Sequence, residues 1–308
     1  MFGFQSIRLL AYAFGTAGGL SGAAYGLLNE QSRRARKIIG PPRAQPLRAD
    51  GVYLPDGSGP VPDADGADAL ELAVLGDSTA AGLGVEEPDE LPGVRIARGM
   101  AEELQRPVAL TTHAVVGTTS RRLRPQVEAA LVTPPRLALI LIGANDVTSK
   151  QRASTSARLL GETVRALMDR GVAVVAGTCP DLGAIRPIPQ PLRAVARSWS
   201  HALGKAQRRE VEAVGGRAVP LADLLSPEFL TRPSEMFSPD NFHPSAAGYA
   251  ATADVLLPVL CDAIGEWAGG PVPRPPVRST AAEARRPTRR IVARLNRGLA
   301  RRAWAGDQ

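Results

Sequence analysis

The chain has 308 residues, of which 44% are hydrophobic and 22% are charged. This balance is typical of a folded globular protein and excludes a largely disordered chain. The formal net charge of +7 is unevenly distributed: residues 1–50 carry +5, residues 51–270 carry −6 and residues 271–308 carry +8. The acidic central region argues against nucleic-acid binding, so we expect no nucleic-acid partner. Two cysteines, Cys179 and Cys261, are too few for a disulfide framework or a four-cysteine zinc site.

The segment 1–39 contains a run of 20 residues without a charge, from Leu9 to Leu28, followed by a basic flank. This length is about what a helix needs to cross a bilayer. The run holds three pairs of glycines four residues apart, the spacing that lets membrane helices approach closely. The sequence therefore predicts a membrane anchor. A signal peptide cleaved near Ser21-Gly22-Ala23 is an alternative. A buried helix of a soluble fold is another, disfavoured by the charged and proline-rich sequence that follows.

Two segments that are rich in proline flank the central region. Residues 40–67 hold six prolines among glycines and aspartates, which predicts an extended linker. Residues 269–308 begin with four closely spaced prolines and then become rich in arginine. Within this tail Ile291, Leu295 and Leu299 recur at helical spacing, which is compatible with a basic amphipathic helix on an anionic membrane. A solvated, disordered tail is the alternative interpretation.

Between these segments, residues 68–268 alternate short apolar runs with longer helical patterns. Strands are expected at 70–75, 107–116, 136–142, 172–177 and 217–221, and helices at 92–105, 121–132, 153–170, 191–214 and 246–267. Continuously apolar strands are typical of a parallel sheet covered on both faces. The pattern predicts a three-layer α/β/α sandwich with a five-stranded parallel sheet. Such folds bind and transform ligands beyond the carboxyl ends of their strands, so the residues that follow each strand are the candidates for chemistry.

The first strand is followed by Gly76-Asp77-Ser78-Thr79-Ala80-Ala81-Gly82-Leu83-Gly84. This segment is neither a dinucleotide fingerprint nor a phosphate loop, and Ala80 stands where a GxSxG elbow has its last glycine. A serine that leaves a strand through a tight turn presents its hydroxyl at the edge of the sheet, near free backbone N–H groups. Helix capping by Asp77 or Ser78 is the alternative.

The C-terminal candidate is Ser238-Pro239-Asp240-Asn241-Phe242-His243-Pro244. An activated serine needs a base, and the base needs an acid that fixes its tautomer. Asp240 and His243 are three residues apart, so one turn can bring the carboxylate to the ring. The other two histidines, His113 and His201, lack an acidic residue at this spacing. The three histidines show no metal-ligand spacing, so we expect no metal and no other cofactor.

Two more segments can donate to an oxyanion. Gly117 follows the second strand, where a glycine lets its N–H approach a substrate closely. Asn145 follows the third strand within Gly143-Ala144-Asn145-Asp146, and its side-chain amide is a possible donor. Each segment can also be an ordinary turn or helix cap.

The order of these blocks resembles the SGNH (GDSL) hydrolase family, a group of bacterial esterases and lipases among others. The blocks are GDSxxxGxG at 76–84, a glycine at 117, GxND at 143–146 and DxxHP at 240–244. The resemblance implies a flavodoxin-like fold, a catalytic triad of Ser78, Asp240 and His243, and an oxyanion hole of Ser78, Gly117 and Asn145. One departure is His113, which stands near the place where the family usually has an asparagine.

The resemblance implies a serine esterase or lipase that hydrolyses carboxylic acyl esters through an acyl-enzyme. Alternatives are a membrane-tethered acyltransferase with the same triad and a non-catalytic scaffold on a hydrolase fold. The loops 178–191 and 223–239 are expected to shape an acyl pocket. They carry the apolar side chains of Leu182, Ile185, Ile188, Leu225, Phe229, Leu230 and Phe237.

We expect the protein to associate with a membrane surface, and two arguments disagree on its side. Five Lys/Arg follow the uncharged run within residues 29–43, whereas only Arg8 precedes it. This asymmetry favours a cytoplasmic body. The resemblance favours export, because many bacterial relatives act on esters outside the cytoplasm.

Overall fold

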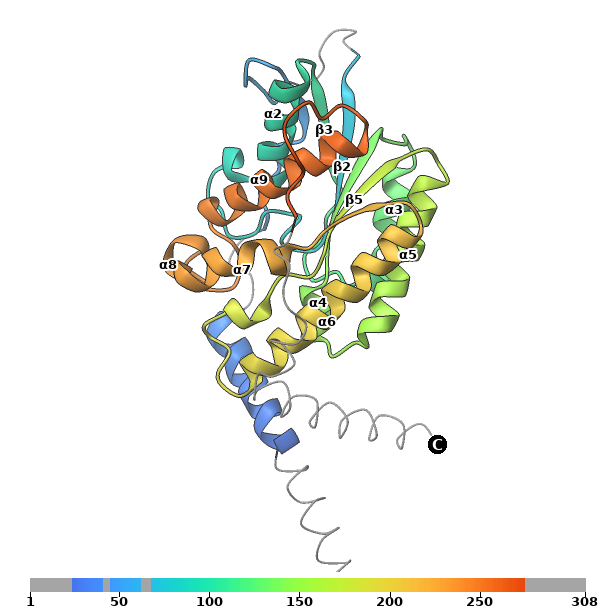
Figure 1. Cartoon of the computed structure of the whole chain (residues 1–308). Helices are drawn as coiled ribbons and strands as arrows, with labels where there is room; N and C mark the ends of the chain where they lie inside the picture. Colours follow the sequence, from blue (N-terminus) through green and yellow to red (C-terminus); the bar gives the residue numbers. More distant parts are fainter. Residues whose placement is uncertain (1–23, 41–44, 62–67, 275–308) are drawn as a thin grey trace, which may run out of the picture.

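The computed structural model describes residues 24–40, 45–61 and 68–274 (Figure 1). The predicted amphipathic helix around Ile291–Leu299 and most of the uncharged run therefore lie outside the described residues. The described part is an α/β sandwich around one six-stranded sheet with the order β1-β3-β2-β4-β5-β6. The strands are β1 (Gly51–Tyr53), β2 (Leu70–Gly76), β3 (Val108–Thr112), β4 (Leu137–Leu141), β5 (Ala173–Gly177) and β6 (Arg217–Val219).

Five of these strands are the predicted ones, and all neighbouring pairs among them are parallel. The sixth, β1, lies in the predicted linker and pairs antiparallel with β3. The expectation of five strands was thus one strand short. The three residues of β1 are too few to show the two-residue periodicity of a strand. Val52 of β1 also forms a β-bridge with Val61, on the far side of a tight turn. The linker is therefore partly built into the edge of the sheet.

The helices cover the two faces of the sheet (Figure 1). On one face α2 (Pro92–Leu104) packs against α9 (Ala246–Ala263). On the other lie α3 (Arg124–Ala130), α5 (Ala153–Met168) and the long α6 (Leu192–Ala213), with α5 against α6. Short helices that the sequence pattern did not predict are α4 (Ala144–Thr148), α7 (Leu221–Thr231) and α8 (Pro233–Met236), together with three 3₁₀ turns, η1 (Pro88–Glu90), η2 (Ser120–Arg122) and η3 (Leu182–Ala184).

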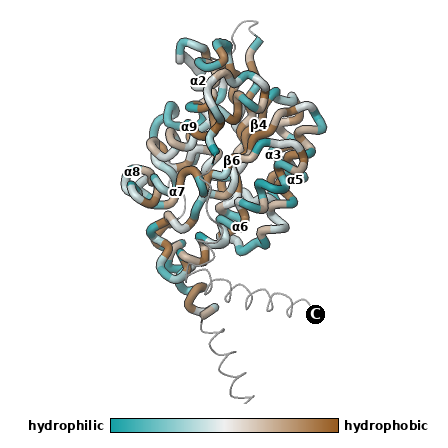
Figure 2. Tube along the Cα trace, viewed as in Figure 1, coloured by the Kyte–Doolittle hydropathy of each residue, from teal (hydrophilic) through white to brown (hydrophobic). Residues whose placement is uncertain are grey.

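Successive side chains of a strand point to opposite faces of the sheet. Because nearly all of them are apolar in these strands, both faces are buried. In β2, Leu72 and Val74 face the cluster beneath α2 and α9, whereas Ala73 and Leu75 face the cluster beneath α3 and α5. Figure 2 shows hydrophobic residues concentrated in the inner strands and hydrophilic ones on the outer helices. Such a sheet leaves only its two ends for polar chemistry, and the segments after the carboxyl ends carry the candidate residues.

Among the described residues, α9 is the one helix long and apolar enough to span a membrane by length and composition. Its Tyr249, Leu256 and Leu260 are fully buried against the rest of the fold. It is accordingly a core helix here, and the predicted anchor at Leu9–Leu28 lies mostly among residues that are not described.

Candidate active site

Ser78, Asp240 and His243 form one hydrogen-bonded chain at the carboxyl end of the sheet. Oγ of Ser78 lies 3.0 Å from Nε2 of His243. On the other side of the ring, Nδ1 lies 2.6 Å from Oδ2 of Asp240. Ser78 and His243 are only 7% and 8% exposed. The structure therefore brings together the three residues that the sequence singled out, although His243 follows Ser78 by 165 residues.

The nucleophile turn is held close to the histidine loop by a glycine. Gly84 has a φ of +110°, and a Cβ there would lie 2.6 Å from the carbonyl oxygen of Pro244 and 2.9 Å from Cβ of His243. A side chain at this position would push the two segments apart. Tyr249, from α9, also bonds to this turn by donating its hydroxyl to the carbonyl of Leu83 at 2.7 Å.

Asp240 is fixed by more than its bond to the ring. Its Oδ1 accepts from the hydroxyl of Ser238 at 2.8 Å and from the backbone N–H groups of Phe242 at 2.8 Å and His243 at 2.9 Å. Burial would raise the pKa of Asp240, but the hydrogen bond to the His243 side chain and these three donors hold it well below its usual range. The carboxylate is thus charged and oriented toward Nδ1.

The two predicted oxyanion residues reach the same corner of the site. The side-chain amide of Asn145 donates to the carbonyl of Thr118 at 3.0 Å and lies 3.5 Å from Oδ2 of Asp77, the residue before Ser78. Gly117 precedes Thr118 and has a φ of +81°, with no atom within 4 Å of the position a Cβ would take. Gly117 and Asn145 are therefore next to each other and next to the turn that carries Ser78.

Sequence reasoning missed the buried side chains that hold this corner together. Gln126 of α3 accepts from the N–H of Gly76 at 2.7 Å and donates to the Gly76 carbonyl at 2.9 Å and to Oγ1 of Thr118 at 3.2 Å. Asp146, fully buried, accepts from the N–H and hydroxyl of Ser120. The sequence signal that could have revealed this role is the polar Gln126, which lies between the apolar core residues Leu123 and Val127.

His113 stands near the place where the family usually has an asparagine before its glycine. It lies just after β3 and donates its backbone N–H to the carbonyl of Val74 at 2.8 Å. It is half-buried, and burial lowers the pKa of its ring. The described contacts of the Gly117 turn come instead from Asn145 and Gln126 through Thr118.

A pocket that is open to solvent lies beside Ser78 and His243. Five of the seven apolar residues expected to shape an acyl pocket line it; Ile188 and Leu230 do not. Phe229 and Phe237 meet edge to face at 5.0 Å. The lining residues from the two predicted loops are Leu182, Ile185, Leu225, Phe229 and Phe237, with Phe242 near the histidine.

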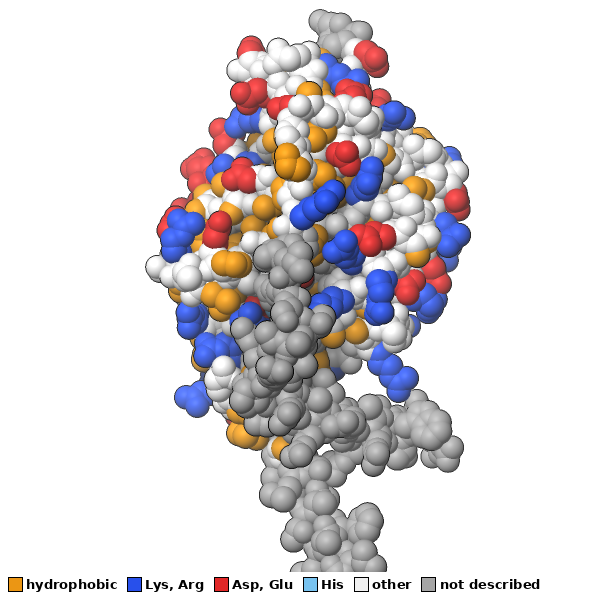
Figure 3. Space-filling view, viewed as in Figure 1, with side chains coloured by type: hydrophobic (Ala, Val, Ile, Leu, Met, Phe, Trp, Pro, Cys, Tyr) orange, Lys and Arg blue, Asp and Glu red, His pale blue; other side chains and the backbone are white. Residues whose placement is uncertain are grey.

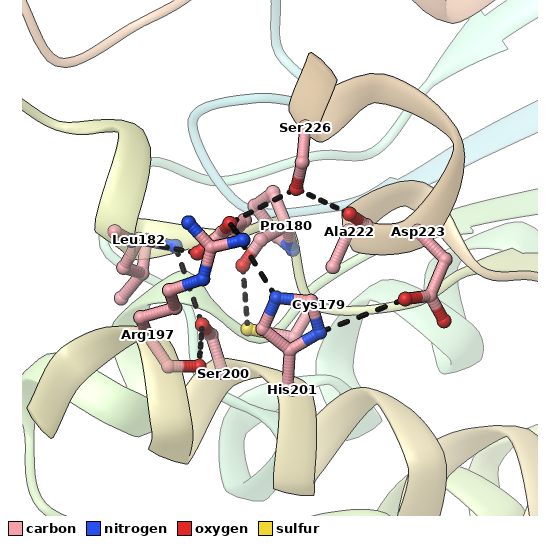
Figure 4. Close-up of polar contacts among 11 residues, drawn as sticks. Cys179, Pro180, Leu182, Arg197, Ser200, His201, Ala222, Asp223 and Ser226 are labelled. Carbon is pink, nitrogen blue, oxygen red and sulfur yellow. Dashed lines mark hydrogen bonds and ion pairs between the residues drawn. The ribbon is translucent and has the colours of Figure 1, made fainter. Parts of the chain in front are cut away.

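One wall of this pocket is braced by a buried carboxylate (Figure 4). Oδ2 of Asp181 accepts from the hydroxyl of Ser226 at 2.9 Å and lies 3.4 Å from both Nη2 of Arg197 and Nε2 of His201. Burial would raise the pKa of Asp181, but His201, Arg197 and the N–H of Gly183 together hold it below its usual value. The cluster connects η3, α6 and α7. The His201 side chain, which is 15% exposed, thus has a structural role as a partner of Asp181.

The described residues hold no group of three or more His, Cys, Asp or Glu side chains arranged to bind a metal ion. Both cysteines are buried and unpaired, and burial raises the pKa of each thiol.

Comparison with known proteins identifies what this site is similar to. Residues 74–251 match the GDSL-like Lipase/Acylhydrolase family. The chain is 45% identical over 285 residues to the GDSL-like esterase Rv1075c of Mycobacterium tuberculosis, a match that covers 89% of this chain and 90% of that one.

Solved structures share the fold at lower identity. The structure of TesA matches with a TM-score of 0.52 at 18% identity, covering 63% of this chain and 99% of its own. A lipase/acylhydrolase from Enterococcus faecalis matches with a TM-score of 0.50 at 18% identity, covering 61% and 93% respectively. These two likenesses concern the arrangement of the sheet and helices.

Proposed function

Because this chain belongs to the GDSL-like lipase/acylhydrolase family and is a serine hydrolase of carboxylic esters, we propose that it works through an acyl-enzyme on Ser78. The single observation that carries the proposal is the chain from Ser78 Oγ to His243 Nε2 and from Nδ1 to Asp240. His243 takes the proton of the Ser78 hydroxyl as its oxygen attacks the acyl carbonyl. Asp240 orients the ring and stabilises the imidazolium that forms.

The same histidine completes both halves of the reaction. It gives its proton to the departing alcohol, and the acyl group stays on Ser78. A water molecule then attacks this ester while His243 accepts one of its protons. The bond from the acyl carbon to Ser78 Oγ breaks, His243 returns the proton to Oγ, and the carboxylic acid leaves. The backbone N–H groups of Ser78 and Gly117 and the amide of Asn145 stabilise the negative charge on the carbonyl oxygen in each tetrahedral intermediate. To donate in this way, Asn145 exchanges its contact with Asp77 or Thr118 for one with the substrate.

The pocket beside Ser78 supports an apolar acyl group as the preferred substrate. Its lining is dominated by aliphatic and aromatic side chains, and the carboxylate of Asp181 is occupied by its own partners. Each buried methylene is worth about 0.8 kcal/mol, or about a fourfold gain in kcat/KM where it enters the pocket. We expect kcat/KM for p-nitrophenyl esters to rise from acetate to butyrate to octanoate. A preference for acetate would contradict the apolar acyl pocket.

A fluorophosphonate probe tests the nucleophile directly. We expect it to label the wild-type protein and to leave Ser78→Ala unlabelled, with hydrolysis by Ser78→Ala and by His243→Ala reduced by about 10³ or more because triad members act as a unit. Thr79→Ala is the matched control, since it removes a neighbouring hydroxyl and keeps Ser78. Labelling of Ser78→Ala, or more than a tenth of the activity in His243→Ala, would overturn the assignment.

A further inference from the structure

A helix at residues 24–39 lies against the catalytic end of the fold (Figure 1). Nε2 of Gln31 donates to the carbonyl of Gln190 at 2.7 Å, and the N–H of Leu192 donates back to Oε1 of Gln31 at 3.1 Å. Arg36 donates to the carbonyl of Thr148 at 2.9 Å. These partners follow the carboxyl ends of β5 and β4, the same edge of the sheet where Ser78 follows β2. The helix is thus attached to the end of the molecule that carries the active site.

The attachment includes the loop that lines the pocket. Gln190 belongs to the loop 178–191, whose Leu182 and Ile185 line the pocket. Ala35 of the helix is only 5% exposed and is part of the apolar core. On the neighbouring turn, Nζ of Lys150 donates to the side chain of Asn29 at 2.6 Å and lies 5.2 Å from the centre of the Tyr25 ring. Hydrogen bonds to both loops and a buried side chain together fix the direction of the helix relative to the pocket.

The exposed side chains of this helix are mostly apolar or basic. Tyr25, Leu27 and Ile38 are 44%, 49% and 60% exposed, which makes them half of the large exposed hydrophobic residues in the described part of the chain. Arg33, Arg34 and Lys37 are exposed on the same helix. Figure 2 shows the hydrophobic start of the helix, and Figure 3 shows hydrophobic and basic side chains around the same lower end of the molecule. Apolar residues flanked by cations are the composition of a surface that binds an anionic bilayer.

The start of the helix is also continuous with the uncharged run Leu9–Leu28, whose last residues it contains. We propose that the partner of this surface is an anionic lipid bilayer and that the helix holds the catalytic end of the enzyme against it. The mouth of the acyl pocket then faces the lipid, and the substrates are amphiphilic esters that reside in the membrane. The choice of substrate rests on the proposed ester hydrolysis, whereas the orientation does not.

Fluorescence quenching in vesicles tests the orientation without any assay of activity. The two native cysteines are buried, so a single introduced cysteine takes the label. Ser149→Cys places it on an exposed residue at the catalytic end, just after α4, and Thr133→Cys on an exposed residue before β4, at the opposite end. The full-length protein is bound to vesicles of phosphatidylcholine and phosphatidylglycerol that contain nitroxide-labelled lipid. We expect at least twofold stronger quenching at residue 149. Equal or reversed quenching, or failure to sediment with the vesicles, overturns the proposal.

A second experiment uncouples the helix from the body. Gln31→Ala combined with Arg36→Ala removes the hydrogen bonds of the helix to Gln190, Leu192 and Thr148 and keeps the uncharged run. Ser32→Ala is the matched control, because it shortens a side chain on the same helix and keeps both those contacts and the exposed basic residues. We expect the double variant to hydrolyse 4-methylumbelliferyl oleate in vesicles at least tenfold more slowly, with soluble p-nitrophenyl butyrate changed less than twofold.

Wild-type vesicle hydrolysis in the double variant would overturn the role of the docked helix. A loss of both activities together would also count against it, because that result indicates damage to the fold rather than to the orientation. If the wild-type enzyme hydrolyses neither ester, ester hydrolysis itself fails, and the quenching experiment still decides which end of the molecule faces the bilayer.

Discussion

At the scale of single residues, the side-chain amides around Ser78 already make hydrogen bonds within the protein in the absence of substrate. The amide of Asn145 donates to Thr118 and contacts Asp77, and Gln126 fixes both Gly76 and Thr118. Such contacts hold an oxyanion donor in place, so that little reorganisation is needed when charge develops. The same arrangement leaves the carboxyl group of Asp77 buried beside Ser78.

Asn145 is expected to act mainly in the transition state. We predict that Asn145→Ala lowers kcat by about 10²–10³ and changes KM much less, because the oxyanion and not the ground-state carbonyl needs the donor. Steady-state kinetics on p-nitrophenyl butyrate measure both constants. Thr148→Ala on the same short helix serves as the control. A change confined to KM would mean that Asn145 binds substrate uniformly.

Asp77 makes stability depend on pH. Burial raises its pKa from 3.8 to about 6, despite the hydrogen bond from the Thr79 N–H that lowers it. Because the folded pKa is the higher one, the neutral form is favoured by folding, and this contribution is full below about pH 4 and is lost as the pH rises through 6. Asp77→Asn is uncharged throughout. We therefore predict that its free energy of unfolding, relative to wild type, increases from pH 4 to pH 7, measured by urea denaturation. A pH-independent difference would contradict the raised pKa.

At the scale of elements, the pocket wall is assembled from segments that have no regular pairing with one another. η3 follows β5, α6 comes next, and α7 follows β6, so the sheet alone does not fix their mutual positions. Asp181 connects all three, through the N–H of Gly183 in η3, Arg197 and His201 in α6, and Ser226 in α7. Since Leu182 and Leu225 line the pocket from these same elements, the cluster sets its width.

The lowered pKa of Asp181 has a definite consequence for stability. A carboxylate held below its usual pKa stabilises the fold above the unfolded-state value, and that stabilisation is lost as the pH falls through the folded-state value. We predict that Asp181→Asn lowers the free energy of unfolding at pH 7 by about 1–3 kcal/mol. The deficit should shrink at acidic pH. Urea unfolding at pH 7 and at about pH 2.5 measures both, with Asp254→Asn on the exposed side of α9 as the control. An unchanged deficit at about pH 2.5 would contradict this explanation.

At the scale of the whole molecule, the central region and the two ends of the chain differ in net charge. The acidic central region carries the sheet and the site, and the helix at 24–39 attaches the basic N-terminal region to the catalytic end. In the membrane orientation that we propose, this attachment places the catalytic end at the bilayer. The domain division at residues 39, 67 and 268 remains a prediction, although β1 already joins part of 40–67 to the sheet.

The proposed chemistry of the whole enzyme uses only serine, histidine, aspartate and asparagine side chains with backbone donors. We therefore predict that hydrolysis of p-nitrophenyl butyrate is unchanged within twofold by EDTA and by added zinc, calcium or magnesium. Wild-type rates with and without chelator after extensive dialysis provide the measurement. Activity that disappears with EDTA and returns with one of these metals would contradict the mechanism.

Local sequence determined the features that depend on short separations. The apolar runs fixed five of the strands, because a parallel strand buried on both faces needs continuous apolar residues. Asp240 and His243 could be paired because three residues separate them and one turn closes the distance. Ser78 could be placed after a strand, and the order of the blocks named the family that the comparisons then showed.

Only the tertiary structure decided the contacts between distant segments. The meeting of Ser78 with His243 spans 165 residues, and the bonds of Gln126 to the nucleophile turn span 50. No clear hydrophobic periodicity marks the short strand β1 or the helices α4, α7 and α8. These elements are stabilised by packing against the completed sheet, so the sequence pattern of each one alone did not predict it. The attachment of the helix at 24–39 to the catalytic end likewise depends on loops that follow two different strands. Whether a polar side chain is buried and which partner it meets depend on the whole fold, and a local pattern carries no information about either.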